Sequence, residues 1–285
     1  MKTPTLGNPQ NTIEILQKYN FNFQKKFGQN FLIDEHVLDK IIRAAEITKD
    51  DYVLEIGPGI GTMTQYLACA AREVTAVEID RALIPILEDT LKEYDNVSII
   101  NEDILKVDIA ALAKEKNGGR PIKVVANLPY YITTPIIMGL FESRVPLKSI
   151  TIMVQKEVAE RLYAKPGTKD YGALSVWIQS YVRVEWGFVV GPGAFNPPPK
   201  VDSAVVTFIP LPRERHPADP KALSSILKLC FQLRRKQLQS ILRRAGRDDT
   251  AAALERLGIA PEARPETLTP EQFQQLAGIF GRSGC

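Results

Sequence analysis

Short apolar runs alternate with amphipathic segments through the first half of the chain. The runs are rich in β-branched residues, and the segments between them carry apolar residues at helical spacing. The predicted strands span residues 52–56, 74–78, 97–100, 122–126 and 149–154, and the predicted helices lie near residues 61–70, 81–93, 107–116 and 134–142. Short strands that are apolar on both faces and joined by helices form a parallel sheet with both faces covered, so this pattern predicts a doubly wound α/β fold. Ligands of such folds bind at the carboxyl edge of the sheet.

After residue 170 the pattern changes to strands alone. Residues 174–190 and 203–209 are predicted to form a closing antiparallel hairpin, linked by Gly191, Gly193 and a run of three prolines, which makes the sheet mixed. Four prolines between residues 210 and 220 mark a stiff linker, and everything beyond it is helical. The predicted parts are an N-terminal tail and short helix at 1–24, the α/β domain at 25–210 and a small all-helical domain at 211–285.

The N-terminal residues are polar and contain helix-breaking prolines and a glycine. We therefore predict that residues 1–11 form a mobile tail and that Thr12 caps a short helix reaching residue 19. A second helix is expected after Asp34, which can cap it.

The composition restricts the class of protein. A chain with 45% hydrophobic and 24% charged residues can bury a core, which excludes wholesale disorder. Three cysteines far apart in the sequence, with no CxxC pair, indicate neither a disulfide framework nor a zinc site and suggest a reducing compartment. No apolar stretch has the length or position of a signal peptide or membrane span, so we expect a cytoplasmic, metal-free protein, monomeric by default.

Positive charge collects in the C-terminal part. Residues 213–285 carry a formal charge of +5, whereas residues 1–212 carry −2. Residues 228–247, read as a helix, hold seven basic residues and no acidic one, and unmixed positive helices often meet phosphate. Either Arg234 or Arg235 falls on the apolar row of that helix, which suggests an interface with RNA or with the α/β domain. The RNA-binding candidates are Arg234, Arg235, Lys236, Arg243, Arg244 and Arg247.

A glycine-rich turn follows the first predicted strand of the sheet. Gly57, Gly59 and Gly61 let the backbone turn tightly and approach a ligand, although a purely structural turn is the simpler alternative. The third glycine of a dinucleotide fingerprint is missing because Thr62 stands in its place, which disfavours a nicotinamide cofactor.

Two carboxylates end the next two strands. Glu78 lies 21 residues after Gly57 and can accept hydrogen bonds from both ribose hydroxyls, unless it caps a helix, a role that Asp80 could fill instead. Asp103 could bind the exocyclic amine of a base or cap the segment beginning at Ile104. Features at three successive strand ends favour a nucleoside-bearing cofactor without a pyrophosphate.

The fourth strand is followed by Asn127-Leu128-Pro129-Tyr130. An exocyclic base amine is a poor nucleophile because its lone pair is delocalised into the ring. If the Asn127 side-chain oxygen and the Leu128 carbonyl accept its two N–H bonds, the nitrogen pyramidalises and directs its lone pair at an electrophilic methyl group. Pro129 stiffens the loop, and Tyr130 offers a face on which a base can stack. The alternative is an ordinary proline turn.

The ordered set of motifs closely resembles the KsgA/RsmA-type ribosomal RNA adenine dimethyltransferases, which have a Rossmann-like class I methyltransferase fold. The resemblance covers most of the chain. Its motifs are Phe27 to Leu32, Glu55 to Gly61, Val77 to Asp80, Glu102-Asp103, Asn127 to Tyr130, Gln155 to Arg161 and Phe195 to Ala204. Members transfer methyl groups from S-adenosylmethionine to two adjacent adenosines in the 3′-terminal hairpin of small-subunit rRNA, giving dimethyladenosines during subunit biogenesis.

The resemblance implies a role for each site residue. Asn30 and Leu32 would cover the methionine end of the cofactor, Gly57 and Gly59 would lie against it, Glu78 would hold the ribose, and Asp103 the adenine. Asn127 would serve both the cofactor and the target amine, while Tyr130 and Phe195 would close the two faces of the flipped base. Without the resemblance, Phe195 would be read as hairpin core. Ser240 stands where the family pattern has Asn.

Several alternatives stay open. The nearest are the resistance methyltransferases that modify large-subunit rRNA, although Pro58, Leu128 and the run from Phe195 favour the first family. A DNA adenine methyltransferase would need a sequence-reading domain, and a dehydrogenase is disfavoured by Thr62. A non-catalytic small-subunit assembly factor would keep the pocket without using it.

Overall fold

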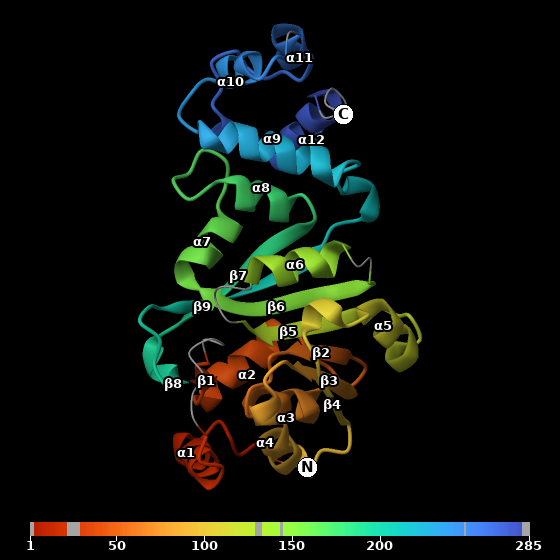
Figure 1. Cartoon of the computed structure of the whole chain (residues 1–285), viewed down its shortest axis with the longest axis vertical. Helices are drawn as coiled ribbons and strands as arrows, with labels where there is room; N and C mark the ends of the chain where they lie inside the picture. The colour runs from red at the N-terminus through yellow and green to blue at the C-terminus, as the bar shows by residue number, and fades with distance from the viewer. Residues whose placement is uncertain (1–2, 22–28, 129–132, 143–144, 248, 281–285) are drawn as a thin grey trace. The chain divides into compact units, whose positions relative to one another are not determined.

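The computed structural model describes residues 3–21, 29–128, 133–142, 145–247 and 249–280, which form two compact units (Figure 1). The sheet unit comprises Met1–Lys156 and Glu185–Ile209, and the helical unit comprises Glu157–Val184 and Pro210–Cys285. The sequence places residues 157–184 in the α/β domain, whereas here they group with the C-terminal helices. The reason is local packing: the Tyr171 hydroxyl donates to the Leu268 carbonyl at 2.8 Å.

The sheet unit is built on a seven-stranded mixed sheet of order β4-β3-β2-β5-β6-β9-β7. The strands are β2 (Tyr52–Ile56), β3 (Glu73–Glu78), β4 (Val97–Asn101), β5 (Ile122–Asn127), β6 (Leu147–Gln155), β7 (Val182–Val190) and β9 (Ser203–Pro210). Strands β2 to β6 are parallel, and β9 runs antiparallel to β6. All five residues of β2 are buried, as expected for a central strand covered on both faces. The predicted doubly wound mixed sheet is confirmed.

Helices occupy the connections between the parallel strands. They are α3 (Thr62–Ala70), α4 (Ile84–Leu91), α5 (Ile109–Asn117) and α6 (Thr133–Glu142), with short 3-10 helices at Arg81–Leu83 and Ile104–Lys106, while α2 (Glu35–Ala44) precedes β2. Asp34 accepts hydrogen bonds from the first backbone N–H groups of α2, as predicted. Strands joined by helices bring their carboxyl ends to one edge of the sheet, where the predicted cofactor residues lie.

The N-terminal tail prediction is wrong from residue 5 onward. Helix α1 (Pro9–Lys18) is capped by Asn8, and Thr12 lies inside it, fully buried, donating to the Leu6 carbonyl at 2.8 Å. Leu6 is only 2% exposed. The tail prediction rests on the polar composition and misses Leu6, which is buried with Leu16 of α1 in one apolar cluster of the sheet unit.

The helical unit consists of short helices around buried apolar residues. They are α7 (Lys156–Tyr163), α8 (Ala173–Gln179), α9 (Pro220–Gln232), α10 (Leu238–Arg244), α11 (Thr250–Arg256) and α12 (Pro270–Phe280), with α9 packed on α8 and α12. Within the described ranges, no helix is long and apolar enough to cross a membrane.

Two expectations are corrected in this unit. Residues 174–179, predicted to be strand, are helical, because Ser175 accepts the Gly172 N–H and the run Val176 to Ile178 buries its side chains. Periodicity does not distinguish strand from helix in so short an apolar run. The basic stretch 228–247 is also not one helix, since α9 ends at Gln232 and α10 begins at Leu238.

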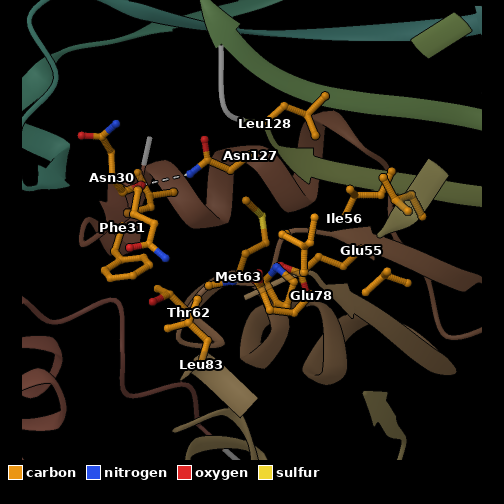
Figure 2. Close-up of a pocket in the computed structure, with 18 of the residues that line it drawn as sticks. Asn30, Phe31, Glu55, Ile56, Thr62, Met63, Glu78, Leu83, Asn127 and Leu128 are labelled. Atoms are coloured by element: carbon orange, nitrogen blue, oxygen red, sulfur yellow. Dashed lines mark hydrogen bonds between the residues drawn. The ribbon is translucent and has the colours of Figure 1, made fainter. Parts of the chain in front are cut away.

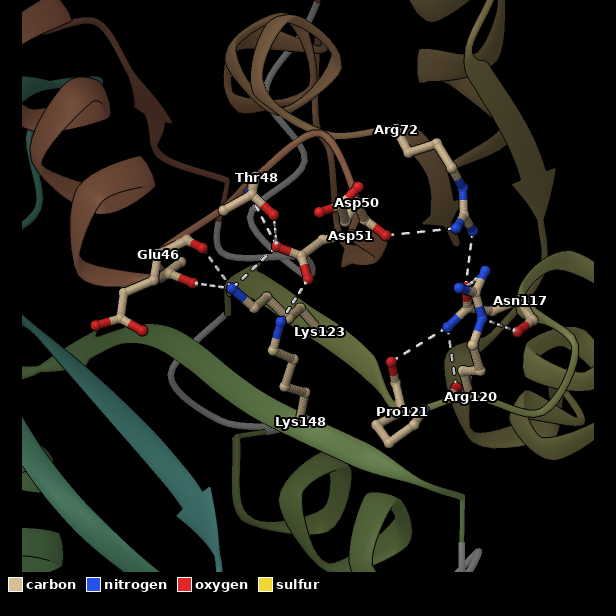
Figure 3. A network of polar contacts seen from close by, with 11 residues as sticks. Glu46, Thr48, Asp50, Asp51, Arg72, Asn117, Arg120, Pro121, Lys123 and Lys148 are labelled. Carbon is tan, nitrogen blue, oxygen red and sulfur yellow. Dashed lines mark hydrogen bonds and ion pairs between the residues drawn. The ribbon is translucent and has the colours of Figure 1, made fainter.

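An ion cluster closes the end of the sheet opposite the predicted cofactor site (Figure 3). Lys123 on β5 is buried, 3.1 Å from an Asp51 carboxylate oxygen and hydrogen-bonded to the Ala45 and Glu46 carbonyls. The exposed Lys148 ammonium lies 2.9 Å from the other Asp51 oxygen. Burial alone would raise the pKa of Asp51, but hydrogen bonds from Lys148, Thr48 and Lys123 lower it to about 2. The cluster ties the end of α2 to β5.

We expect Asp51→Ala to lower the free energy of unfolding by about 3–5 kcal/mol, because Lys123 would keep a buried charge without its carboxylate. Denaturant titration at pH 7 measures the change. Lys123→Met is the matched control and should cost much less, since Asp51 keeps Lys148. The folded pKa of Asp51 is depressed, so its contribution is present above about pH 4 and is lost as pH falls toward 2. Equal losses in the two variants would contradict this interpretation.

Candidate active site

One pocket gathers the carboxyl ends of β2, β3 and β5 with two short strands, β1 (Phe31–Leu32) and β8 (Phe195–Asn196), which pair antiparallel (Figure 2). Its described lining includes every residue predicted to bind the cofactor and three of the five predicted to act on the target base, with Asn127 in both groups. These are Asn30, Leu32, Gly57, Gly59, Glu78, Asp103 and Asn127, with Leu128 and Phe195. Residues from six separate stretches of sequence thus meet at the sheet edge that the doubly wound topology favours for ligands.

The glycine loop depends on backbone conformations that other residues rarely adopt. Gly57, Gly59 and Gly61 have φ values of 70°, 63° and 91°. A Cβ atom at Gly59 would lie 2.9 Å from an atom of the Phe31 ring, so Gly59 also leaves space for that ring. Two features therefore require glycine in this loop: the left-handed backbone at all three positions and, at Gly59, the close approach of Phe31.

Glu78 and Asp80 have separate roles. The two Glu78 carboxylate oxygens accept the Asp80 N–H at 2.8 Å and the Gly59 N–H at 3.1 Å, while Asp80 accepts the Ala82 N–H and caps the 3-10 helix. Burial raises the pKa of Glu78, against the two backbone donors. Glu78 thus lies in the pocket beside the glycine loop and does not cap the helix. Asp103 does both: it accepts the Leu105 N–H at 3.0 Å and lines the pocket.

The Asn127 amide has a defined orientation. Its Nδ2 donates to the Asn30 carbonyl at 3.4 Å, and Figure 2 shows this contact at the rim of the pocket. A carbonyl can only accept, so the nitrogen must face Asn30 and the Oδ1 atom must face away from it. The neighbouring Leu128 is buried, and its N–H donates to the Met153 carbonyl at 3.4 Å. Pro129 and Tyr130 lie outside the described residues.

Phe195 lies in the hydrophobic core as well as in the pocket wall. It is 4% exposed, opposite Leu32 in the β1–β8 pair, and belongs to a cluster that includes Met63. Both the core interpretation and a role beside the target base are compatible with this position.

Glu55 is a pocket residue to which sequence reasoning assigns no role. It is 2% exposed at the end of β2, and its Oε2 atom has no hydrogen-bond partner within the described part of the chain. Burial, with a smaller contribution from the Glu78 charge, raises the pKa of Glu55 to about 8. The sequence did contain a signal for Glu55, because a carboxylate stands inside an otherwise apolar central strand. Proteins rarely bury a carboxylate without a partner.

The basic candidates occupy the helical unit and differ among themselves. Arg235 and Lys236 are exposed in the segment after α9, and Arg243 and Arg244 are exposed at the end of α10. Arg234 instead pairs with Glu266 at 2.6 Å and donates to the Thr168 carbonyl at 3.0 Å. The apolar row that suggested an interface for Arg234 is thus explained by a contact inside the unit. Arg247 is half-buried after α10.

No cluster of His, Cys, Asp and Glu among the described residues could hold a metal ion. The mixed sheet, the glycine loop and the acidic strand ends define a methyltransferase of the Rossmann-like class. The family model "Ribosomal RNA adenine dimethylase" matches residues 20–281, and the chain belongs to that family, as its motifs predicted.

Relatives and solved structures agree with this membership. A "Ribosomal RNA small subunit methyltransferase A" from Lachnoclostridium phytofermentans is 59% identical, with 96% of this chain and 97% of the relative covered. A protein of the same name from Clostridioides difficile is 46% identical, with 94% of each covered. A dimethyladenosine transferase from Plasmodium falciparum has a TM-score of 0.76 at 29% identity, covering 88% of this chain and 98% of that one. The 23S rRNA methyltransferase ErmE has a TM-score of 0.66 at 30% identity, with coverages of 89% and 100%.

Proposed function

We propose that this protein transfers methyl groups from S-adenosylmethionine to the exocyclic amines of two adjacent adenosines in the 3′-terminal hairpin of small-subunit (16S) rRNA. The products are dimethyladenosines, and the substrate is an immature small subunit in the cytoplasm. The protein would act on it as a monomer. The observation that carries the proposal is the Asn127 amide, whose Nδ2 donates to the Asn30 carbonyl, in a pocket that Glu78 and Asp103 also line. The family and the names of its close relatives support the choice of rRNA.

The pocket fits a cationic nucleoside cofactor. When bound, S-adenosylmethionine supplies an electrophilic methyl group on a positively charged sulfur. Glu78 would hold the ribose, and Asp103 the adenine. The Glu55 Oε2 atom, which has no hydrogen-bond partner within the described part of the chain, would accept a hydrogen bond from the methionine ammonium group of S-adenosylmethionine. None of the described lining residues is Lys, Arg or His, so the pocket has no positive side chain to repel such a ligand.

The chain's own groups then activate the target amine. We infer that the Asn127 Oδ1 atom and the Leu128 carbonyl accept its two N–H bonds, which localises the nitrogen lone pair toward the methyl donor. Each transfer would form one N–C bond as the S–C bond of the methyl donor breaks, leaving S-adenosylhomocysteine, and the amine would release one proton to solvent. The base must leave its stack to reach this point, and Tyr130 and Phe195 are proposed to hold its faces. The exposed basic residues of the helical unit would bind RNA phosphates, as shape-based recognition of double-stranded RNA requires.

The first experiment is methyl transfer from labelled S-adenosylmethionine to unmethylated small subunits and, in parallel, to large-subunit rRNA, followed by digestion to nucleosides. Dimethyladenosine in the small-subunit hairpin supports the proposal. Label only in large-subunit rRNA would place the protein with the resistance methyltransferases. Binding to small subunits without any label would favour an assembly factor.

Glu55 should couple cofactor binding to proton release. Its carboxyl, with a pKa of about 8, is mostly neutral at pH 7 and must ionise to bind an ammonium group. Affinity should therefore rise about tenfold between pH 6 and pH 7, because each pH unit below the pKa costs one factor of ten. Calorimetry in buffers of different ionisation enthalpy measures the released proton.

Glu55→Gln should abolish the proton release and flatten the pH dependence. Glu102→Gln, a change at an exposed lining carboxylate, is the control and should keep both. The pKa of Glu55 is higher in the folded protein than in the unfolded chain, so between about pH 4.5 and 8 the folded protein binds more protons than the unfolded chain. The contribution of Glu55 to the free energy of unfolding therefore falls as pH rises through that range. Glu55→Gln should remove that trend. Unchanged proton release in Glu55→Gln would exclude Glu55 as its source.

A further inference from the structure

The N-terminal segment, defined as residues 3–21, supports the pocket from behind. Leu6 and Leu16 are buried in one cluster with Phe31, Ile60 and Leu83. Phe31 and Leu83 line the pocket, and Ile60 lies inside the glycine loop, whereas no residue of the N-terminal segment is among the described lining. The segment therefore contacts the wall of the site without contacting the ligand space.

A buried glutamine fastens this segment to the sheet unit. Gln65 on α3 is 4% exposed, and its Oε1 accepts the backbone N–H groups of Thr5 at 2.9 Å and Leu6 at 3.1 Å. Its Nε2 donates to the Thr90 carbonyl at 2.9 Å. The Thr90 hydroxyl donates in turn to the Ile60 carbonyl at 2.9 Å. A continuous chain of hydrogen bonds thus runs from the N-terminal segment to the glycine loop.

The space around the segment is tightly filled. A Cβ atom at Gly7 would overlap the Tyr66 hydroxyl and lie 2.7 Å from the Glu35 side chain, so the backbone passes directly against α2 and α3. At the other end, Lys18 of α1 forms an ion pair with Asp89 of α4. The segment is thus held at both ends as well as through its apolar side chains.

The contacts continue from Phe31 to the Asn127 amide. The Phe31 ring packs against Gly59 on one side and against Phe21 of the N-terminal segment, with ring centroids 5.8 Å apart. The residue before Phe31 is Asn30, whose carbonyl accepts the Asn127 Nδ2–H. A shift of Phe31 would therefore move the group that fixes the orientation of Asn127.

We propose that the N-terminal segment is a positioning element of the methyltransferase site, holding Phe31 against Gly59 and so keeping the Asn30 carbonyl where it orients Asn127. Leu6, Leu16 and Gln65 are its positioning residues. The inference deepens the proposed function and rests on it, since it specifies how the same site is held.

The test compares Leu6→Ala/Leu16→Ala and Gln65→Met with Leu91→Ala. Leu91 is as buried as Leu6 but belongs to a cluster with Ala68, Leu87 and Tyr94, which contains no described pocket residue. Gln65→Met removes the acceptor of two N–H groups without emptying much space, so it decides the question if the double variant does not fold. All proteins are studied as full chains, well below their melting temperatures.

Four quantities are measured: the Kd for S-adenosylmethionine, kcat and KM on small subunits, and the Asn127 side-chain 15NH2 signal in the cofactor-free protein. In the double variant and in Gln65→Met we expect cofactor Kd to rise about tenfold and kcat to fall, with KM for the subunit unchanged, since small misplacements of reacting groups are costly. The hydrogen-bonded Asn127 signal should shift or broaden. Leu91→Ala should lower the melting temperature but leave these quantities as in the wild type.

Equal changes in Leu91→Ala would show a general effect of stability and would overturn the inference. Wild-type behaviour of the double variant, or of Gln65→Met should the double variant not fold, would overturn it too. A wild-type protein that neither binds S-adenosylmethionine nor methylates subunits would instead refute the proposed function. The Asn127 signal would still report on the positioning in that case, so the two failures are distinguishable.

Discussion

Asn127→Ala is expected to abolish methyl transfer, lowering kcat by at least about a thousandfold, while small-subunit binding stays within twofold. The variant loses the Oδ1 acceptor proposed to localise the lone pair of the target amine. It also loses the Nδ2–H that donates to the Asn30 carbonyl and fixes the amide. Label incorporation under single-turnover conditions measures the chemical step, and filter binding measures affinity for the subunit.

Asn117→Ala is the matched control for this substitution. Asn117 is equally an asparagine inside the sheet unit, 4% exposed, but it lies at the end of α5 and binds Arg72 through its Oδ1 at 2.7 Å (Figure 3). We expect Asn117→Ala to lower stability and leave kcat unchanged. Undiminished turnover by Asn127→Ala would refute the proposed mechanism.

Reversing the exposed charges Arg235→Glu/Lys236→Glu should weaken RNA binding about tenfold to a hundredfold at moderate salt. Each lost phosphate contact removes about 0.7–0.9 from the slope of log affinity against log salt, so the loss of two contacts should lower the slope by about 1.4 to 1.8. Titrations of the small subunit at several salt concentrations measure both values. The cofactor Kd should not change, because these residues are not among the described lining of the pocket.

Arg234 is a poor choice for that test, although its sequence position suggests it equally. Arg234→Glu would place a carboxylate against Glu266 and is expected to destabilise the helical unit before it reports on RNA. A matched control is Lys221→Glu/Arg256→Glu, which reverses two exposed charges of the same unit outside the basic stretch. An equal loss of affinity in this control would show that net charge, and not the basic stretch, governs binding.

Local sequence rules predicted the parts of the site that depend on backbone and strand ends. The glycine loop could be predicted because glycine adopts left-handed φ values in a tight turn at little cost, whereas other residues rarely do. Glu78 and Asp103 could be predicted because parallel strands place their carboxyl ends at one edge. Residues 174–179 were mistaken for a strand because a short apolar run has no distinguishing period, and packing against α9 decided for a helix.

Burial and long-range pairing could not be predicted in the same way. The apolar strand around Glu55 signals its burial, but the raised pKa of its carboxyl depends on enclosure by residues far apart in the sequence. The sequence predicts Arg234 to be an RNA-binding residue, but in the structure its guanidinium pairs with Glu266, 32 residues further along the chain. Residues 1–11 are predicted to be a tail because their composition is polar. The hydrogen bonds from Thr5 and Leu6 to Gln65, and the cluster that Leu6 shares with Phe31, show instead that the chain is packed from residue 5 onward.

The sequence by itself determined the class of fold, the family and the set of residues at the sheet edge, since periodicity and motif spacing are local properties of the chain. The tertiary structure alone decided which partners orient each of those side chains through hydrogen bonds. It showed that the Asn30 carbonyl orients the Asn127 amide and that Glu78 binds the glycine loop while Asp80 caps a helix. Such assignments depend on distances between residues far apart in sequence, and these are fixed only when the apolar surfaces pack together.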